Sequence, residues 1–223
     1  MSGAASSLKS RLRDVPVLQG ASSDDNFAQL GTTPHEAFEH WLNEAIEAGV
    51  KEPHAMTLST VDDMGFPDAR VLILKNVDSR GWHFAVKSST PKGRHIAQNP
   101  HVALTFYWPE ICRQIRIRGV ATQLPEPECR EDFSQRPQGS KISAMASKQS
   151  EILADVEDLT QSLENAKNIL DQRPNSVVAD WAVYAVEPVT VEFWQGQKSR
   201  QHRRLQYVYQ DFDKSWTKQR LWP

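Results

Sequence analysis

Residues 191–205 read VEFWQGQKSRQHRRL, and this stretch is the strongest indication of the fold in the sequence. Its composition is typical of a strand, a polar turn over residues 196–199, and a second strand. Strands joined by so short a turn pair antiparallel, because parallel pairing needs a long crossover. The stretch therefore predicts antiparallel β-structure in this part of the chain.

Basic side chains recur at every second position of the second strand. Because side chains alternate faces along a strand, Arg200, His202 and Arg204 are expected on one face, about 6.6 Å apart at each step. Neighbouring basic groups repel one another unless an anion faces them. With Trp194 just before the turn, the row indicates a site for a flat anionic ligand. The alternative is a solvated sheet face.

The length and the charge of the chain limit the classes of protein to which it can belong. The chain has 223 residues, which suits one large domain or two small ones. Lysine and arginine total 26 against 28 aspartate and glutamate, a balance that argues against a dedicated nucleic-acid binder.

No apolar run approaches the roughly 20 residues that span a bilayer, and no secretory signal follows Met1, so we expect no membrane association and a cytoplasmic location. Cys112 and Cys129 stand alone, which predicts no metal site and fits a reducing compartment.

The remaining sequence predicts an α+β fold that is mostly antiparallel β-structure. Residues 1–31 lack a stable period and are expected to form a flexible arm. A helix follows, with Thr33 as its N-cap, Pro34 in its first position and Glu36 closing a capping box. Short turns between strands, before any long helix, favour a barrel or a sandwich over a doubly wound sheet. The strands are expected over residues 55–61, 69–77, 82–86, 101–108, 114–123, 181–186 and 189–195, and residues 216–221 close the chain.

Peripheral helices are expected between the strands. Residues 127–135 and 140–146 predict two short helices. Residues 147–150 look like the cap of a long amphipathic helix. Its apolar stripe comprises Ile152, Val156, Leu159, Leu163, Ala166 and Leu170. The stripe predicts packing against the barrel or against a second subunit.

Residues 88–94 read SSTPKGR and open another helix. With Thr90 as N-cap and a proline after it, Lys92 lies in the first turn, beside backbone N–H groups that have no helical partner. The pattern predicts either a phosphate seat or a plain helix cap. Arg70 is a second candidate, because an arginine in an apolar strand needs a partner where it is buried. Lys75 is expected on the opposite face of that strand, so one small anion should not contact both.

Seven short segments of the sequence, taken in order, match the motifs of a known family. They are RVLILK at residues 70–75, KGR at 92–94, RQ at 113–114, RP at 136–137, SKQS at 147–150, EFWQG at 192–196 and RQHRR at 200–204. Together they resemble the pyridoxamine (pyridoxine) 5′-phosphate oxidases, over roughly residues 33–223. The resemblance implies an FMN-binding split β-barrel over residues 32–223, with peripheral helices and a C-terminal dimerisation segment. It also implies a homodimer with each FMN held between the two subunits.

The resemblance, carried over position by position, implies a cofactor site. Arg70 and Lys92 correspond to ligands of the FMN phosphate, with Thr90 assisting. Gln149 and Ser150 would come from the other subunit. The full implied set of FMN contacts is Arg70, Val71, Leu72, Ile73, Leu74, Lys75, Thr90, Lys92, Gln114, Gln149, Ser150, Trp194 and Arg204.

A substrate site is implied in the same way. Arg136 and Ser140 correspond to ligands of the substrate phosphate. Lys75 corresponds to a residue near both the substrate and the flavin ring. Arg200 and His202 correspond to the catalytic residues, which hold the pyridine ring over the flavin.

Several positions depart from the pattern of the family. Asp132 stands where a tyrosine of the substrate-phosphate site is expected, and its carboxylate would repel a phosphate. Pro91 replaces an arginine beside the FMN phosphate, and Gln201 replaces a leucine. Residues 85–86 and 182–185 replace an aromatic–Thr pair and a Gly-Gly-aromatic-Arg segment. The expected cofactor site therefore keeps more of the pattern than the expected substrate site does.

The resemblance implies an enzyme of vitamin B6 salvage. Pyridoxamine or pyridoxine 5′-phosphate would be oxidised to pyridoxal 5′-phosphate, while O₂ is reduced to H₂O₂. One alternative is a related FMN-dependent oxidase that acts on a late intermediate of phenazine biosynthesis. A second is a non-catalytic protein that binds flavin or pyridoxal phosphate. A third, an RNA-binding surface built on the arginines at 113, 116, 118 and 200–204, conflicts with the net charge of −2.

Overall fold

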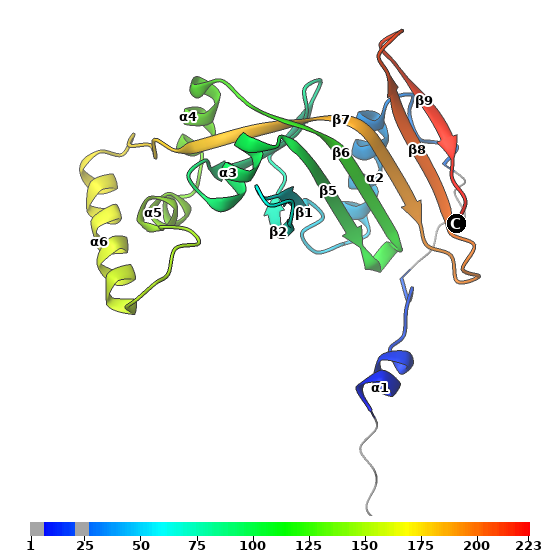
Figure 1. Cartoon of the computed structure of the whole chain (residues 1–223), viewed down its shortest axis with the longest axis horizontal. Helices are drawn as coiled ribbons and strands as arrows, with labels where there is room; N and C mark the ends of the chain where they lie inside the picture. The colour runs from blue at the N-terminus through cyan, green and yellow to red at the C-terminus, as the bar shows by residue number, and fades with distance from the viewer. Residues whose placement is uncertain (1–6, 21–26) are drawn as a thin grey trace, which may run out of the picture. The chain divides into compact units, whose positions relative to one another are not determined.

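The computed structural model describes residues 7–20 and 27–223 (Figure 1). The chain forms two compact units, each assembled from segments far apart in the sequence. Unit 1 comprises the described parts of Met1–Pro53, with Phe106–Arg116 and Val191–Pro223. Unit 2 comprises His54–Thr105 and Ile117–Thr190.

Each unit has its own helices and strands, and three strands belong to both. Unit 1 holds α1 (Leu8–Asp14), α2 (Pro34–Glu47), the 3-10 turn η1 (Pro109–Ile111), β8 (Arg203–Gln210) and β9 (Ser215–Arg220). Unit 2 holds β1 (Ala55–Val61), β2 (Pro67–Ile73), β3 (Asn76–Asp78), β4 (Gly81–Lys87), α3 (Pro91–Gln98), α4 (Glu126–Ser134), α5 (Gln138–Ala146) and α6 (Val156–Gln172). The shared strands are β5 (His101–Trp108), β6 (Arg113–Gln123) and β7 (Trp181–Gln195).

The strands pair in the order β2-β1-β5-β6-β7-β4-β3, with β8 on β7 and β9 on β8. The pairs β1–β2, β1–β5, β3–β4, β4–β7 and β8–β9 are antiparallel. The predicted α+β class with mostly antiparallel strands is therefore confirmed. Register matters for the site, because Leu58 of β1 lies opposite Arg70 of β2 and both share a face of the sheet.

The core of unit 1 forms where α2 meets the strands. Helix α2 has the predicted capping box, in which the Thr33 hydroxyl accepts from the Glu36 amide and the Glu36 carboxylate accepts from the Thr33 amide. Its Trp41 ring meets the Phe193 ring edge to face, with centroids 5.1 Å apart. Removing each of these large rings from water stabilises the fold by about 2–3 kcal/mol.

In unit 2 the core lies between β1, β4 and β7. Leu58, Trp82 and Phe84 are fully buried, and the Phe84 ring stacks on the Tyr184 ring with centroids 5.6 Å apart. Side chains in a protein core pack about as densely as molecules in a crystal, so a layer of this kind resists rearrangement. It supports the residues that face the pocket described below.

Three predicted elements differ from the structure. Strand 69–77 is broken, because β2 ends at Ile73 and the Lys75 amide turns to donate to the carbonyl of His83. Strands 181–186 and 189–195 are the single strand β7, since its extended backbone accommodates the proline at position 188. The long helix begins at Val156 and not after residues 147–150, because the Asp155 side chain caps it and Ser150 has a φ of 73°.

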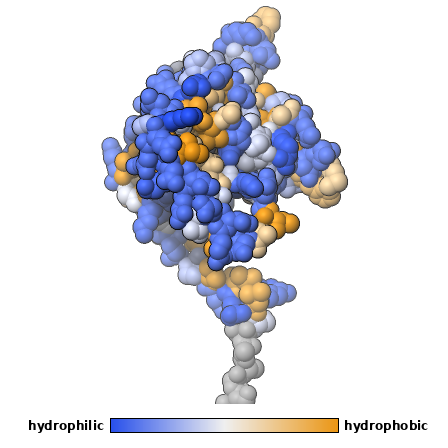
Figure 2. Space-filling model, turned by 90° about the vertical axis from the view of Figure 1, so that its left-hand side faces the viewer, coloured by the Kyte–Doolittle hydropathy of each residue, from blue (hydrophilic) through white to orange (hydrophobic). Residues whose placement is uncertain are grey.

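The apolar stripe of α6 is only partly packed. Ala166 and Leu170 are buried, and α6 contacts α5. Ile152 and Val156 are 96% and 67% exposed, so this end of the stripe does not pack within the chain, and its packing against a second subunit stays a prediction. Figure 2 views the α6 side of Figure 1 and shows hydrophobic side chains among hydrophilic ones on this face.

The predicted arm, residues 1–31, contains helix α1, which has no buried residue. Near its end, Phe27 and Leu30 are buried, and the Phe27 ring lies 6.0 Å from the Trp41 ring. Parts of the arm fall outside the described residues, and its flexibility stays a prediction. Within residues 7–20 and 27–223, no helix is long and apolar enough to cross a membrane.

Candidate active site

A buried lysine and a neighbouring arginine form the cationic end of the site in unit 2. Helix α3 begins as predicted, with Thr90 as N-cap and Pro91 in its first position, and Lys92 follows in the first turn. The Lys92 side chain is buried, and its Nζ donates to Oε1 of Gln149 at 2.8 Å. Burial, and then the nearby guanidinium of Arg70, lower the pKa of Lys92 below its ordinary value. Such a cation is stabilised when an anion binds beside it.

Arg70 is held from three sides. Its Nη1 donates to Thr60 Oγ1 at 2.8 Å and to the Leu58 carbonyl at 3.2 Å, and its Nη2 pairs with Asp68. Asp68 is 56% exposed, so water screens its charge more than it screens the two cations. The pair Arg70 and Lys92 therefore keeps a net positive potential, which suits a phosphate.

The segment before α3 is tightly folded around this cationic pair. Thr90 is the N-cap residue, but its buried hydroxyl donates to the Lys87 carbonyl at 2.6 Å and makes no capping hydrogen bond to the helix. A side chain at Gly93 would come within 2.4 Å of the Ser88 carbonyl oxygen. Only glycine allows this close approach, which places the first turn of α3 against residues 88–90.

A pocket of about 330 Å³ opens beside Lys92. Its lining combines an apolar wall with several cations, a donor set that fits a flat ring carrying a phosphate. The lining residues are Val71, Leu72, Ile73, Lys75, Ala85, Val86, Lys87, Lys92, Arg136, Ser143, Ala144, Ser147, Gln149 and Trp181. Sequence reasoning named Lys75, Lys92, Arg136, Gln149 and the apolar run, but it missed Lys87, Ser143, Ser147 and Trp181.

Arg136 provides a second, separate cation in this pocket. Its guanidinium carbon lies 4.3 Å from the centre of the Trp181 ring, and burial lowers the pKa of the group. Its Nε is buried and has no hydrogen-bond partner among the described residues. A buried donor of this kind is costly unless a ligand accepts from it. Ser140, the other predicted ligand of the substrate phosphate, is not among the lining residues, whereas Ser143 one turn later is.

The negative charge of Asp132 is compensated by two neighbours that are distant in the sequence. Its Oδ1 lies 3.2 Å from Nζ of Lys75, and its Oδ2 accepts from Nε1 of Trp181 at 2.9 Å. The expected repulsion of a phosphate by this carboxylate is therefore reduced by Lys75. The same ion pair takes up part of the charge that Lys75 would offer to a ligand.

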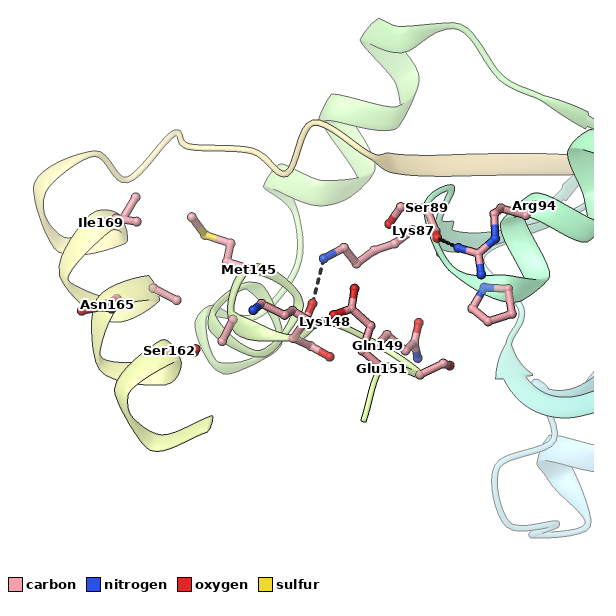
Figure 3. Close-up of a pocket in the computed structure, with 15 residues that line it drawn as sticks. Lys87, Ser89, Arg94, Met145, Lys148, Gln149, Glu151, Ser162, Asn165 and Ile169 are labelled. Carbon is pink, nitrogen blue, oxygen red and sulfur yellow. Dashed lines mark hydrogen bonds between the residues drawn. The ribbon is translucent and has the colours of Figure 1, made fainter. Parts of the chain in front are cut away.

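A larger pocket of about 530 Å³ lies between α3, α6 and the segment that joins α5 to α6 (Figure 3). The Lys87 Nζ donates to the carbonyl of Ser147, in this segment, at 2.9 Å and to that of Ala144, near the end of α5, at 3.3 Å. Gln149 and Ser150 line this pocket. Gln149 also accepts a hydrogen bond from Lys92 of its own chain, while its contact with an FMN held by the other subunit stays a prediction.

In unit 1, the structure breaks up the predicted row of Arg200, His202 and Arg204. Strand β8 begins at Arg203, so Arg200 and His202 lie in the preceding turn, and the prediction that all three share a strand face is wrong. The Arg200 amide donates to the carbonyl of Gln197, and its φ is 67°. The turn closes as a tight loop, which removes two of the three residues from the strand.

The turn still orders His202 beside Trp194. The Nδ1 of His202 accepts from the Gln197 amide at 3.1 Å, and the His202 and Trp194 ring centroids are 4.9 Å apart. Arg204 donates to both carboxylate oxygens of Glu192, at 2.8 and 3.1 Å, and to the Trp222 carbonyl at 2.9 Å. The Glu192 carboxylate raises the pKa of Arg204. The predicted FMN contact at Arg204 thus starts from a guanidinium that already has protein partners.

Unit 1 also holds a buried polar network. Arg113 of β6 is buried; its Nη1 pairs with Glu44 at 2.6 Å, and its Nε donates to Gln195 at 3.1 Å. Its guanidinium lies 4.4 Å from the centre of the Trp41 ring. The network links the neighbours of Gln114 and Trp194, two predicted FMN contacts. These belong to unit 1 and the Lys92 pocket to unit 2, so their union in one site stays a prediction.

Comparison with known proteins gives the family. The model of the family "Pyridoxamine 5′-phosphate oxidase" matches residues 42–169, and that of the "Pyridoxine 5′-phosphate oxidase C-terminal dimerisation region" matches residues 181–223. The chain belongs to the pyridoxamine 5′-phosphate oxidase family. This is a family of FMN-dependent oxidoreductases, so the predicted enzyme class is confirmed. The dimerisation-region match supports the expected homodimer.

Individual oxidases of the family cover most of the chain. The pyridoxine/pyridoxamine 5′-phosphate oxidase of Haemophilus ducreyi is 44% identical over 198 residues, which are 87% of this chain and 91% of the relative. The oxidase of the same name from Salinibacter ruber is 41% identical over 191 residues, covering 85% of this chain and 89% of the relative.

Solved structures support the fold. PhzG from Burkholderia lata, in complex with tetrahydrophenazine-1-carboxylic acid, has a TM-score of 0.83 at 28% identity and covers 91% of this chain and 100% of PhzG. A pyridoxamine 5′-phosphate oxidase-related, FMN-binding protein from Nostoc punctiforme has a TM-score of 0.71 at 16% identity, covering 86% and 100%. The antiparallel sheet is the half-barrel of the split-barrel fold, as the sequence predicted.

Proposed function

We propose that the protein uses FMN to oxidise pyridoxamine or pyridoxine 5′-phosphate to pyridoxal 5′-phosphate, with O₂ reduced to H₂O₂. The observation that carries this proposal is the pair of separate cationic groups that serve the pocket of unit 2. Lys92 with Arg70 forms one group, and Arg136 with its unpartnered Nε forms the other. Two groups suit a cofactor and a substrate that each carry one phosphate. Relatives about 40% identical are named for this reaction.

At the cofactor end, Lys92 and Arg70 would hold the phosphate of FMN. Charge-assisted bonds to a phosphate are roughly twice as strong as neutral hydrogen bonds. The apolar residues 71–73 of β2, with Ala85 and Val86 of β4, would pack against the flavin ring. Lys75, at the end of this run, would lie near the ring, where its charge favours a reduced flavin.

At the substrate end, Arg136 would bind the phosphate of the vitamer. The Trp181 ring stacks on the guanidinium, and the buried Nε, which has no partner among the described residues, would donate to the ligand. When FMN is bound, it supplies the hydride acceptor and the reaction with O₂ that the protein itself lacks. The chain supplies position, charge and exclusion of water.

Arg200 and His202 would hold the pyridine ring of the substrate. Because Nδ1 of His202 accepts from the Gln197 amide, Nε2 carries the proton in the neutral ring. His202 then presents a hydrogen-bond donor, which suits orientation of a substrate oxygen. Arg200 would add a positive charge beside it.

The test uses the purified full-length protein. Its visible spectrum should show bound flavin, and aerobic addition of pyridoxine 5′-phosphate should yield pyridoxal 5′-phosphate and H₂O₂ in equal amounts. A folded, dimeric preparation that stays colourless after FMN is added would contradict the cofactor assignment. A yellow protein that oxidises neither phosphorylated vitamer would leave only flavin binding.

A second candidate is an FMN-dependent oxidase whose substrate carries a carboxylate. Asp132 favours it, because this carboxylate beside Lys75 lowers the positive charge available to a doubly charged phosphate. PhzG, with a TM-score of 0.83, was solved with a carboxylic acid. Faster turnover of tetrahydrophenazine-1-carboxylic acid than of either phosphorylated vitamer would favour this candidate.

A further inference from the structure

The hydroxyl of Thr60 lies between Arg70 and His95. Thr60 is on β1, in unit 2, and is 1% exposed. Its Oγ1 is 2.8 Å from Nη1 of Arg70 and 3.1 Å from Nδ1 of His95. His95 is in the last turn of α3, three residues after Lys92. The hairpin of β1 and β2 and the helix α3 therefore meet at one buried oxygen.

The chemistry of the three groups fixes the direction of the two hydrogen bonds. A guanidinium only donates, so the Thr60 oxygen accepts from Arg70. A buried hydroxyl proton needs an acceptor of its own, and Nδ1 of His95 is the one within reach. His95 Nδ1 therefore accepts, Thr60 donates to it, and Arg70 donates to Thr60.

The other contacts of Arg70 do not hold its guanidinium equally well. The Leu58 carbonyl shares Nη1 at 3.2 Å, and Asp68, which is 56% exposed, holds Nη2 at the edge facing solvent. Without the Thr60 hydroxyl, the strongest remaining attraction would be toward Asp68 and water. Thr60 is thus the buried contact that fixes Nη1 and keeps the guanidinium in its orientation while Asp68 holds Nη2.

We infer that Thr60 and His95 are positioning residues for the phosphate of FMN, an inference that rests on the proposed function. Helix α3 carries Lys92 directly and sets Arg70 through His95 and Thr60. One short helix therefore fixes both cations that would receive the phosphate. Neither Thr60 nor His95 touches the ligand in this arrangement, and both act through Arg70.

The decisive experiment compares Thr60→Val with Thr60→Ser. Valine has nearly the shape of threonine but no hydroxyl, whereas serine keeps the hydroxyl. FMN-free protein is titrated with FMN and, separately, with riboflavin, which has the same ring and no phosphate. Thr60→Val should weaken FMN binding about tenfold, the scale of one hydrogen bond to a charged group, and leave riboflavin binding unchanged. Thr60→Ser should bind both flavins like the wild type.

His95→Leu tests the outer member of the chain. It should weaken FMN binding about threefold, and the double variant with Thr60→Val should bind FMN no more weakly than Thr60→Val alone, because the two residues act in series. Gln98→Ala, an exposed change on the same helix, is the matched control and should change nothing. Thermal unfolding of each variant establishes that it is folded, and His95→Leu keeps the test open if Thr60→Val does not fold.

Two results would overturn the inference. Thr60→Val could bind FMN as tightly as the wild type, or it could lose FMN and riboflavin equally, which would indicate general damage to the fold. Arg70→Met separates this failure from failure of the proposed function. If Arg70→Met also keeps its preference for FMN over riboflavin, the phosphate assignment itself is wrong; if only Thr60→Val keeps it, the positioning role alone is wrong.

Discussion

Lys75 and Asp132 form an ion pair, with Nζ and Oδ1 3.2 Å apart, next to the arginine proposed to bind the substrate phosphate. The carboxylate is 19% exposed, and its charge also acts on Arg136. The cluster of Lys75, Asp132 and Arg136 thus has one net positive charge. With the tyrosine that the family pattern has at position 132, the cluster would have two net positive charges.

Removal of this negative charge should favour doubly charged ligands. Asp132→Asn keeps an acceptor for the Trp181 indole and leaves Lys75 and Arg136 unopposed. We expect the KM for pyridoxine 5′-phosphate to fall about three- to tenfold, with kcat little changed, since Coulomb energies of this size are typical of partly buried pairs. Steady-state kinetics would measure it, with Asp171→Asn on the exposed face of α6 as the control. An increase in KM would show that the ion pair holds Lys75 in place for the substrate.

Arg136 should govern substrate affinity without affecting the cofactor. Arg136→Met keeps the stem that packs on Trp181 and removes the charged donors. We expect kcat/KM for the phosphorylated vitamer to fall about 100-fold, on the scale of a lost charge-assisted pair, while FMN remains bound. Absorbance of the bound flavin and initial rates would be compared on one preparation. Loss of FMN in this variant would place Arg136 in the cofactor site.

Arg200 should affect turnover more than flavin content. Arg200→Ala removes the charge proposed to lie over the pyridine ring, so kcat should fall about 100-fold while the protein stays yellow. Gln201→Ala, the adjacent change in the same turn, should keep at least half of the activity. Unchanged turnover of Arg200→Ala would remove this residue from the site.

Asp78 should contribute to stability in a defined pH range. The guanidinium and amide of Arg80, with the His83 ring, hold the pKa of Asp78 at about 2, below its ordinary 3.8. A lowered carboxyl pKa stabilises the fold above the pKa of the unfolded chain, and this stabilisation disappears as the pH falls from about 4 to about 2.

We therefore expect Asp78→Asn to lower the free energy of unfolding by about 1–2 kcal/mol at pH 7, and by little near pH 2. Urea unfolding at both pH values would measure the difference. An equal loss at both would attribute the effect to hydrogen-bond geometry and not to charge.

Two substitutions in the buried Arg113 network should lower the stability of the protein by different amounts. Arg113→Met leaves the buried side-chain oxygen of Gln195 without its donor, and we expect the free energy of unfolding to fall by about 2 kcal/mol. Glu44→Gln should cost less than about 1 kcal/mol, because Glu44 is 38% exposed and water can replace the contact. Equal costs for the two variants would show that the ion pair, and not Gln195, dominates.

Local signals were sufficient to predict much of the fold. The capping box of Thr33 and Glu36 spans four residues, so the start of α2 could be read directly. The start of α3 at Thr90 and Pro91 was equally local. The start of α6 was misplaced because residues 147–150 offer cap residues, whereas the helix uses Asp155.

The candidate site was predicted less completely because its contacts are distant in the sequence. Lys92 meets Gln149 across 57 residues, and Asp132 meets Trp181 across 49. The role of Thr60 depends on the register that sets Leu58 opposite Arg70, which no local pattern gives. The prediction for Arg200, His202 and Arg204 was wrong for a related reason. Side chains alternate between faces only within a strand, and β8 begins at Arg203.

Helix α3 has only eight residues, yet it supports both cations of the proposed phosphate seat. Ligand occupancy and the order of this helix are therefore linked, because whatever binds the ordered form stabilises it. A preparation that loses its flavin during purification should be cut by proteases more readily between residues 88 and 98. Supplying FMN in the lysis buffer should protect that segment, so stored enzyme would keep its integrity as well as its colour.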